Sequence, residues 1–272
     1  MDTPCHIHFL FEMDLELNHG TGHRKEKAMQ TRIDEIAPDF YRLSTYVEKI
    51  NLQFNQFLVN DDEPLLYHTG LRGMFPQIRK AVAKILEPAR LRWIGFSHFE
   101  ADECGSLNEW MALAPHAEPV CGMVGALVNI NDYIGGRARV MASGEVLATG
   151  RHRFRFLETP HVPHAWDASL LFEETGATLF CSDLFLQNGD LSPLTSDDVI
   201  EPSRQALLGY EAGPLAHPYP YTSLTDATLQ MLAGLRPKQL AIMHGPSFSG
   251  DGETALQGLA AMYAATLGAP KG

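Results

Sequence analysis

The sequence predicts one large domain of mixed α and β structure, an α+β arrangement in which helices pack outside two layers of sheet. Three observations support this fold class. Short apolar segments separated by turn residues begin after Asp39, and segments with helical spacing interrupt them from Phe75 onward. The 272 residues contain no internal repeat, low-complexity tract or long linker that would separate two domains, and 45% of them are hydrophobic, enough for a substantial core.

The first half of the chain is expected to pass from an antiparallel meander to a β-α-β order. Consecutive strands are predicted where short apolar runs end in turn residues, over residues 40–47, 53–59 and 65–67. Ile78, Val82 and Ile85 are spaced to share one helical face, which predicts a helix over residues 75–86. The apolar residues 91–96 then form a buried strand.

The second half repeats this alternation. Helices are expected over residues 123–130, 224–235 and 253–267. Strands are expected over residues 137–141, 145–148, 152–156 and 239–243, and a hairpin around Gly176 over residues 170–173 and 178–181. Mixed order of this kind is typical of sheets covered by helices on their outer faces.

Composition excludes several classes of function. A formal charge of −12 would repel nucleic-acid phosphates and anionic membrane headgroups, so neither is expected as a partner. No stretch approaches the length of a membrane span, and the N-terminus lacks the basic region of a secretory signal. Cys5, Cys104, Cys121 and Cys181 form no C-x-x-C pair and are interpreted as reduced thiols. The protein is therefore expected in the cytoplasm.

Residues 1–30 differ from the rest and are predicted to be a flexible N-terminal extension, with residues 31–272 forming the single domain. Histidines at positions 6, 8, 19 and 23 lie among charges there. Because a mobile arm loses conformational entropy when it holds a ligand geometry, a metal site in this segment is the weaker interpretation.

The sharpest chemical feature follows the apolar residues 91–96. His98, Glu100 and Asp102 stand at every second position. In an extended segment alternate side chains point the same way, so these three potential metal ligands are expected to face one pocket. A polar strand edge can also alternate by chance, and this remains the competing interpretation.

Three further candidates stand beside other apolar strands. His164 precedes residues 170–173, Asp183 follows Cys181, and His244 follows Met243. Carboxylates gathered in one pocket would repel one another unless cations compensated them. Three histidines and three carboxylates exceed the needs of one tetrahedral zinc ion, so the sequence predicts two metal ions sharing a bridging carboxylate.

This ordered set, together with residues 164–169 (His-Ala-Trp-Asp-Ala-Ser) and the glycine after His244, resembles the diiron domain of flavodiiron proteins, a branch of the metallo-β-lactamase superfamily. The resemblance covers roughly residues 31–272 and implies a metallo-β-lactamase-like αββα sandwich. It implies that His98, Glu100 and His164 hold one iron, that Asp102 and His244 hold the other, and that Asp183 bridges them.

One residue departs from the family pattern. Glu103 stands where the family has a further histidine, so the second iron either gains a carboxylate or keeps an open, water-filled position. Hydrolytic relatives usually have histidine where Glu100 stands, and a carboxylate there favours iron or manganese, although zinc can also bind.

The resemblance implies binding of dioxygen, and of nitric oxide as a second gas, either as an oxygen sensor or as a reductase. Too few residues follow His244 for a flavin domain, so no flavin is expected in this chain, and a separate redox or signalling protein becomes the expected partner. A homodimer is a further possibility. The alternative function is a metal-dependent hydrolase of ester, thioester or lactone bonds, and a binding module with a vestigial site is the third.

Three residues are candidates for contacts just outside the ligands. His161 could donate to the site or carry protons, His68 ends a predicted strand, and Trp166 is expected to shield the metals from water. For both histidines a purely structural role, in packing or hydrogen bonding, is the competing interpretation.

Overall fold

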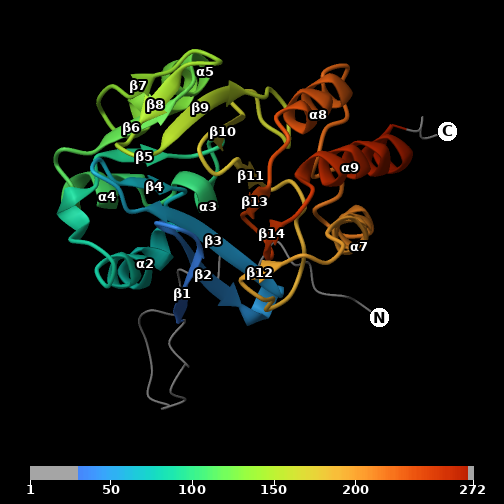
Figure 1. Cartoon of the computed structure of the whole chain (residues 1–272), viewed down its shortest axis with the longest axis horizontal. Helices are drawn as coiled ribbons and strands as arrows, with labels where there is room; N and C mark the ends of the chain where they lie inside the picture. Colours follow the sequence, from blue (N-terminus) through green and yellow to red (C-terminus); the bar gives the residue numbers. More distant parts are fainter. Residues whose placement is uncertain (1–29, 269–272) are drawn as a thin grey trace.

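Two seven-stranded sheets lie face to face in the computed structural model, which describes residues 30–268 (Figure 1). The first sheet has the order β1 (Thr31–Ala37), β2 (Phe40–Val47), β3 (Leu52–Val59), β4 (Leu65–Tyr67), β5 (Trp93–Gly95), β6 (Glu118–Cys121) and β7 (Arg139–Val140). The second has the order β12 (Leu194–Thr195), β14 (Ser247–Ser249), β13 (Gln239–Ile242), β11 (Thr178–Ser182), β10 (Ser169–Glu173), β9 (Arg153–Glu158) and β8 (Val146–Ala148). The predicted extension and its histidines lie outside the described residues, apart from residue 30.

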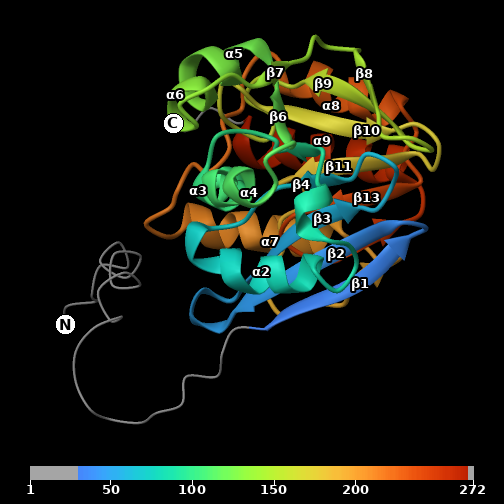
Figure 2. The ribbon, with the colours of Figure 1, turned by 90° about the vertical axis from the view of Figure 1, so that its left-hand side faces the viewer.

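Helices cover the outer faces of both sheets. On the first sheet they are α2 (Phe75–Val82), α3 (Ala101–Cys104), α4 (Leu107–Leu113), α5 (Met123–Gly125), a π-helix (Ala126–Ile130) and α6 (Asn131–Tyr133). On the second they are α7 (Ile200–Glu211), α8 (Thr225–Gly234) and α9 (Gly252–Leu267). Figure 2 shows α2, α3 and α4 in front of the first sheet, and Figure 1 shows α7, α8 and α9 grouped beyond the second. The predicted αββα sandwich is confirmed.

Alternation along the strands produces three apolar layers. On β10, Leu170 and Phe172 pack under α7–α9, whereas Leu171 points between the sheets. The neighbouring strand β11 repeats this pattern, with Phe180 in the layer between the sheets. The Phe180 ring lies within 6.1 Å, centroid to centroid, of the rings of Phe40, Phe57, Phe154 and Tyr67. Truncating such a residue to alanine typically costs ~3–5 kcal/mol of stability.

The strand pairing confirms the predicted meander and its conversion to β-α-β order. β2, β3 and β4 pair antiparallel in sequence, whereas β4, β5 and β6 are parallel. The predicted hairpin of β10 and β11 is also present. The helix expected over residues 75–86 is shorter and ends at Val82, because residues 83–85 form hydrogen-bonded turns.

The parallel strands decide where functional residues can gather. β5 ends before Ser97, β11 before Asp183, and β13 before Met243. β10 is antiparallel to β11, so the loop before β10 lies at the edge where β11 ends. Segments that follow parallel strands therefore meet at one edge of the sandwich, the usual position of ligand sites in sheets of this kind.

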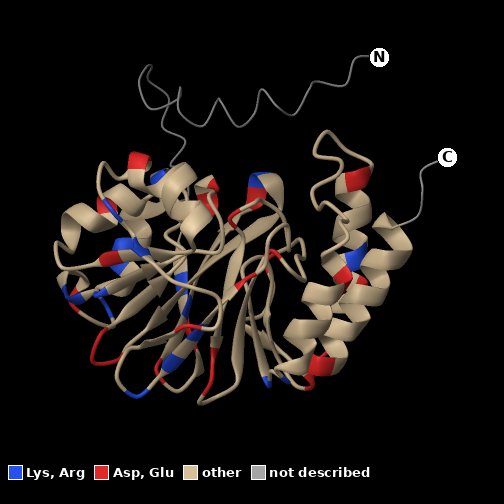
Figure 3. Ribbon diagram, turned by 90° about the horizontal axis from the view of Figure 1, so that it is seen from above, with Lys and Arg blue, Asp and Glu red and all other residues tan. Residues whose placement is uncertain are grey.

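Figure 3 shows lysines and arginines interspersed with aspartates and glutamates over the described ribbon. Within residues 30–268, no helix is both long and apolar enough to cross a membrane. Among the described residues, Cys104, Cys121 and Cys181 are buried and form no disulfide.

Candidate metal centre

Four donors form a cluster at this edge. His98 Nε2 lies 3.1 Å from Glu100 Oε2 and 3.6 Å from Asp183 Oδ2. His164 Nε2 lies 3.0 Å from the same Asp183 oxygen and 3.3 Å from Glu100 Oε2. One ligand atom from each of these residues lies within 4.8 Å of the others. We call the space among them the first position.

The other oxygen of Asp183 faces a different pair. His244 Nε2 lies 3.2 Å from Asp183 Oδ1 and 3.3 Å from Asp102 Oδ2. We call the space among these three residues the second position. Asp183 is therefore shared, with one carboxylate oxygen directed at each position, and the six residues singled out from the sequence lie together.

The local geometry that joins His98, Glu100 and Asp102 differs from the prediction. An extended segment was expected over residues 97–102, but residues 97–99 form a bend and helix α3 begins at Ala101. Glu100 is extended and precedes this helix, while Asp102 and Glu103 lie in its first turn, where the helix dipole favours acidic side chains. The helical turn directs Glu103 inward as well, and its side chain is fully buried.

Proximity of opposite charges changes the pKa values of the cluster. Burial alone would raise the pKa of Asp183, but hydrogen bonds from His164 and His244 hold it well below its usual value. Burial would lower the pKa of His244, whereas its contacts with Asp102 and Asp183 raise it to about 10. Burial, followed by the charges of Asp102 and Asp183, raises the pKa of Glu103 well above its usual value. The negative charge of the carboxylates, when they are ionised, thus exceeds the positive charge that the nearby histidines can supply.

Hydrogen bonds hold the histidine rings in place. His98 Nδ1 lies 3.0 Å from Ser97 Oγ, which is also 2.7 Å from Ser182 Oγ and 3.1 Å from His68 Nε2. Burial lowers the pKa of His68 to about 3, so this imidazole is neutral. His68 therefore lies one hydroxyl away from His98, a candidate ligand, and this contact also fits the purely structural role weighed for it.

The loop carrying His244 is held by the first sheet. His244 Nδ1 donates to the backbone oxygen of Gln53 at 2.7 Å. The side-chain amide of Asn55 donates to the carbonyls of Ile242 and Gly245, at 2.9 and 2.8 Å. The buried guanidinium of Arg42 donates to the Gly245 carbonyl as well, at 3.0 Å. Sequence reasoning missed this clamp, because polar residues on a central strand give no pattern that points to a loop nearly 200 residues away.

The remaining predicted residues contribute less. Trp166 is 69% exposed, so its ring does not by itself exclude water from the donors. His161 is half-buried in a left-handed conformation, and its backbone N–H donates to the Ala165 carbonyl. The cluster opens to solvent on the side of Glu100 and His164, whose side chains are 50% and 26% exposed.

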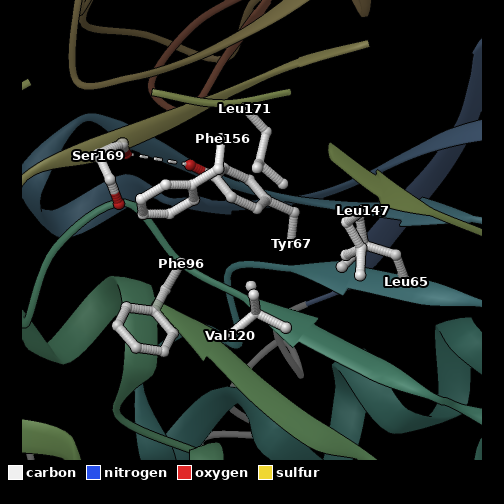
Figure 4. Close-up of a pocket in the computed structure, with 9 residues that line it drawn as sticks. Leu65, Tyr67, Phe96, Val120, Leu147, Phe156, Ser169 and Leu171 are labelled. Atoms are coloured by element: carbon white, nitrogen blue, oxygen red, sulfur yellow. Dashed lines mark hydrogen bonds between the residues drawn. The ribbon is translucent and has the colours of Figure 1, made fainter. Parts of the chain in front are cut away.

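Two cavities lie near the cluster without including its donors. One, of about 10 Å³, lies between the sheets and is lined mainly by apolar residues such as Leu65, Phe96 and Phe156 (Figure 4). It has roughly the volume that one water molecule needs. In Figure 4 the Tyr67 hydroxyl at its wall bonds the Ser169 carbonyl, at 3.5 Å. The other, of about 250 Å³, is a surface hollow floored by Tyr219.

Comparison with known proteins gives one family match. The model of the ODP family beta lactamases matches residues 52–206. The rubredoxin-oxygen oxidoreductase of Megalodesulfovibrio gigas is 23% identical over 221 residues, which cover 80% of this chain and 54% of that protein. The anaerobic nitric oxide reductase flavorubredoxin of Salmonella arizonae is 27% identical over 155 residues, 54% of this chain and 31% of that protein. The chain thus spans about half or less of these relatives.

Solved structures show the same fold. A flavo di-iron protein variant from Thermotoga maritima superposes with a TM-score of 0.74 at 21% identity, over 86% of this chain and 62% of that one. A fragment of diflavin flavoprotein A 5 from Nostoc sp. gives a TM-score of 0.74 at 16% identity, over 88% of this chain and 97% of the fragment. These likenesses confirm the metallo-β-lactamase-like architecture.

Proposed function

The chain belongs to the ODP family of beta lactamases, and from that membership we propose that it holds two iron ions and binds dioxygen or nitric oxide at them. The observation that carries the proposal is the division of the Asp183 carboxylate. One oxygen faces His98 and His164, and the other faces His244. A carboxylate shared in this way is what two neighbouring cations require of a bridging ligand.

The donor set fits iron. In this proposal the first ion is held by His98, Glu100, His164 and Asp183, and the second by Asp102, His244 and Asp183. Mixed imidazole and carboxylate donors suit iron, and the carboxylate share also suits manganese. The site already holds more buried negative charge than its histidines balance, as the raised pKa of Glu103 indicates. Two divalent cations would remove that excess.

Two reduced iron ions would together supply the electrons that a bound diatomic gas takes up. The protein's own contribution is to orient the donors. His244 gives its Nδ1 proton to the Gln53 carbonyl, and His98 places Nδ1 against Ser97 Oγ, so each directs Nε2 toward the carboxylates. Such contacts around metal ligands set the ring orientation and the tautomer. The exposed side of Glu100 and His164 is the route by which a small gas reaches the site.

The names of the relatives indicate the gases and the electron-transfer groups. One is an oxygen oxidoreductase named with rubredoxin, and another is a nitric oxide reductase flavorubredoxin. In keeping with these names, we propose that electrons come from a separate redox protein or that the site reports oxygen to a signalling partner. The flavin in this proposal belongs to that separate donor.

Metal analysis combined with anaerobic gas mixing tests the proposal. Protein reconstituted with Fe²⁺ is expected to hold two ions per chain, and its absorption spectrum should change on mixing with dioxygen or nitric oxide. A long-lived oxygen adduct would indicate a sensor, and rapid consumption with a flavoprotein donor would indicate a reductase. Binding of fewer than two ions, or hydrolysis of esters or lactones without any response to either gas, would contradict the proposal.

A further inference from the structure

Glu103 has an environment that no other carboxylate among residues 30–268 shares. Its side chain is fully buried, and neither of its oxygens accepts a hydrogen bond from an N–H or hydroxyl group; its hydrogen-bonding neighbour is another acid, the carboxyl group of Asp102. A buried charge in this condition costs several kcal/mol unless a cation compensates it. The position of Glu103 therefore requires an explanation beyond packing.

Other buried acids of the chain show what a structural carboxylate looks like here. Glu173 accepts hydrogen bonds from the backbone of Thr175 and Gly176 and lies 3.2 Å from His152 Nδ1. Asp61 accepts from the Thr149 hydroxyl and the His152 backbone N–H, at 2.9 and 3.0 Å. Both are satisfied by the protein itself, in contrast to Glu103.

The Glu103 carboxylate lies beside both ion positions. Glu103 Oε1 is 3.6 Å from Nε2 of His98, a donor of the first position. Oxygens of Glu103, Glu100 and Asp102 lie within 4.8 Å of one another, and Asp102 is a donor of the second position. The backbone of α3 is anchored there, since the Thr69 N–H donates to the Glu103 carbonyl at 2.6 Å. Glu103 is thus buried beside donors of both positions.

We propose that Glu103 is a metal ligand shared between the two positions, and that it raises the affinity of the pair for hard divalent ions such as Mn²⁺, relative to Zn²⁺, above the ratio that a histidine at the same position would give. This inference rests on the proposed two-ion function and deepens it. Carboxylate oxygen suits manganese better than imidazole does, whereas imidazole suits zinc. A histidine at position 103, as in the family pattern, would supply a neutral and softer donor.

Charge accounting supports the same conclusion. Glu100, Asp102, Glu103 and Asp183 carry four negative charges when ionised, which match the four positive charges of two divalent ions. A single ion would leave half of that charge uncompensated in a buried site. The two ions are therefore expected to bind cooperatively, because each ion reduces the repulsion that the other would otherwise leave.

The test compares Glu103→Gln and Glu103→His with the wild type, with Glu173→Gln as a control for removing a buried acid far from the cluster. Ion stoichiometry and affinity are measured by metal analysis and titration calorimetry with Mn²⁺ and Zn²⁺, and two-ion occupancy by the electron paramagnetic resonance of Mn²⁺. Thermal unfolding of the metal-free proteins is measured in parallel.

Glu103→Gln is expected to weaken Mn²⁺ binding at least about 10-fold, the lower end of effects seen even for contacts outside the ligand shell. The same variant should not lower the melting temperature of the metal-free protein, because it removes a carboxyl group whose ionised form burial and the charges of Asp102 and Asp183 disfavour. Glu103→His should retain two-ion binding with the Mn²⁺ to Zn²⁺ affinity ratio lowered. Glu173→Gln should leave both affinities unchanged.

Wild-type Mn²⁺ affinity in Glu103→Gln, or an unchanged Mn²⁺ to Zn²⁺ ratio in Glu103→His, would overturn the inference while leaving the two-ion proposal intact. Failure of the wild type to bind two ions would overturn both. If Glu103→Gln does not fold, the affinity ratio of Glu103→His decides the question.

Discussion

Two neighbouring residues of β3 are expected to respond in opposite ways to the loss of a side-chain amide. Asn55 and Gln56 are both fully buried and point to opposite faces of the strand. The Asn55 amide donates two hydrogen bonds to the His244 loop, whereas neither amide atom of Gln56 has a partner. Near-isosteric apolar replacements, Asn55→Leu and Gln56→Met, isolate this difference.

The magnitudes follow from the contacts. Asn55→Leu removes two hydrogen bonds, each worth about 1 kcal/mol, and takes a donor from the Ile242 carbonyl, at a further cost of about 1 kcal/mol. The Asn55 Oδ1 atom is buried without a partner, so its removal offsets about 1 kcal/mol of this cost. The Gly245 carbonyl keeps its bond from Arg42. A net loss of about 2 kcal/mol corresponds to a fall in melting temperature of roughly 4–8 °C for a domain of this size. Gln56→Met removes only unpartnered polar atoms and should leave stability unchanged or raise it by about 1 kcal/mol.

Urea and thermal denaturation of the metal-free variants measure both effects, and metal titration follows the position of His244. Asn55→Leu should weaken ion binding, because it releases the loop that holds this ligand, whereas Gln56→Met should not. Equal changes in unfolding free energy for the two variants would refute the hydrogen-bond account. Destabilised Asn55→Leu protein that still bound two ions with wild-type affinity would refute the role of the clamp in placing His244.

Three further outcomes are expected. Hydrogen bonds from Thr149 and the His152 backbone outweigh the effect of burial and lower the pKa of Asp61 to about 2, so the ionised group stabilises the fold above the unfolded pKa of about 4, and this stabilisation is lost as pH falls toward 2. Asp61→Asn should therefore cost about 2 kcal/mol of stability at pH 7, and urea denaturation should show a weaker dependence of its stability on pH in the acid range. Contacts with Asp102 and Asp183 raise the pKa of His244 to about 10, so a metal ion must displace the proton of this histidine at neutral pH. The affinity for metal ions should therefore rise with pH between about 6 and 8, and calorimetry in buffers of different ionisation enthalpy should detect the released proton. A metal affinity that does not depend on pH would contradict this prediction. Free metal at 100 times its dissociation constant should stabilise the fold by about 2.7 kcal/mol and raise the melting temperature by roughly 5–11 °C, an effect that a chelator reverses; the absence of any shift would argue against a site formed in the native state.

Sequence pattern predicted the elements whose faces differ in polarity or whose ends carry turn residues. The bounds of β2 and β4 agree with the prediction, as does the β10–β11 hairpin around Gly176. β6 escaped prediction because its four residues include Pro119, which does not favour a strand. Helix α7 also escaped, since Pro202 and Gly209 interrupt its sequence and its buried face is formed by small residues as well as Leu207.

The candidate ligands could be found because each stands near the end of an apolar strand, and the packing of the two sheets brings these strand ends to one edge of the sandwich. The residues that hold these ligands in place could not be found from the sequence. Asn55 and Arg42 act on His244 across two sheets, and nothing in their own neighbourhood distinguishes them from polar residues facing solvent. Asp102 was predicted to face the site for a different reason from the one observed, since the helical turn of α3, not strand alternation, aims it inward.

The division of the donors between the two sheets affects how the site comes into being. His98, Glu100 and Asp102 follow β5 in the first sheet, whereas Asp183 and His244 follow β11 and β13 in the second. Contacts between residues so far apart in the chain form late and slowly during folding. The complete donor set therefore exists only after the two sheets have packed together. Metal ions bound to donors of both sheets should slow unfolding, and so lengthen the time before the native protein is irreversibly denatured.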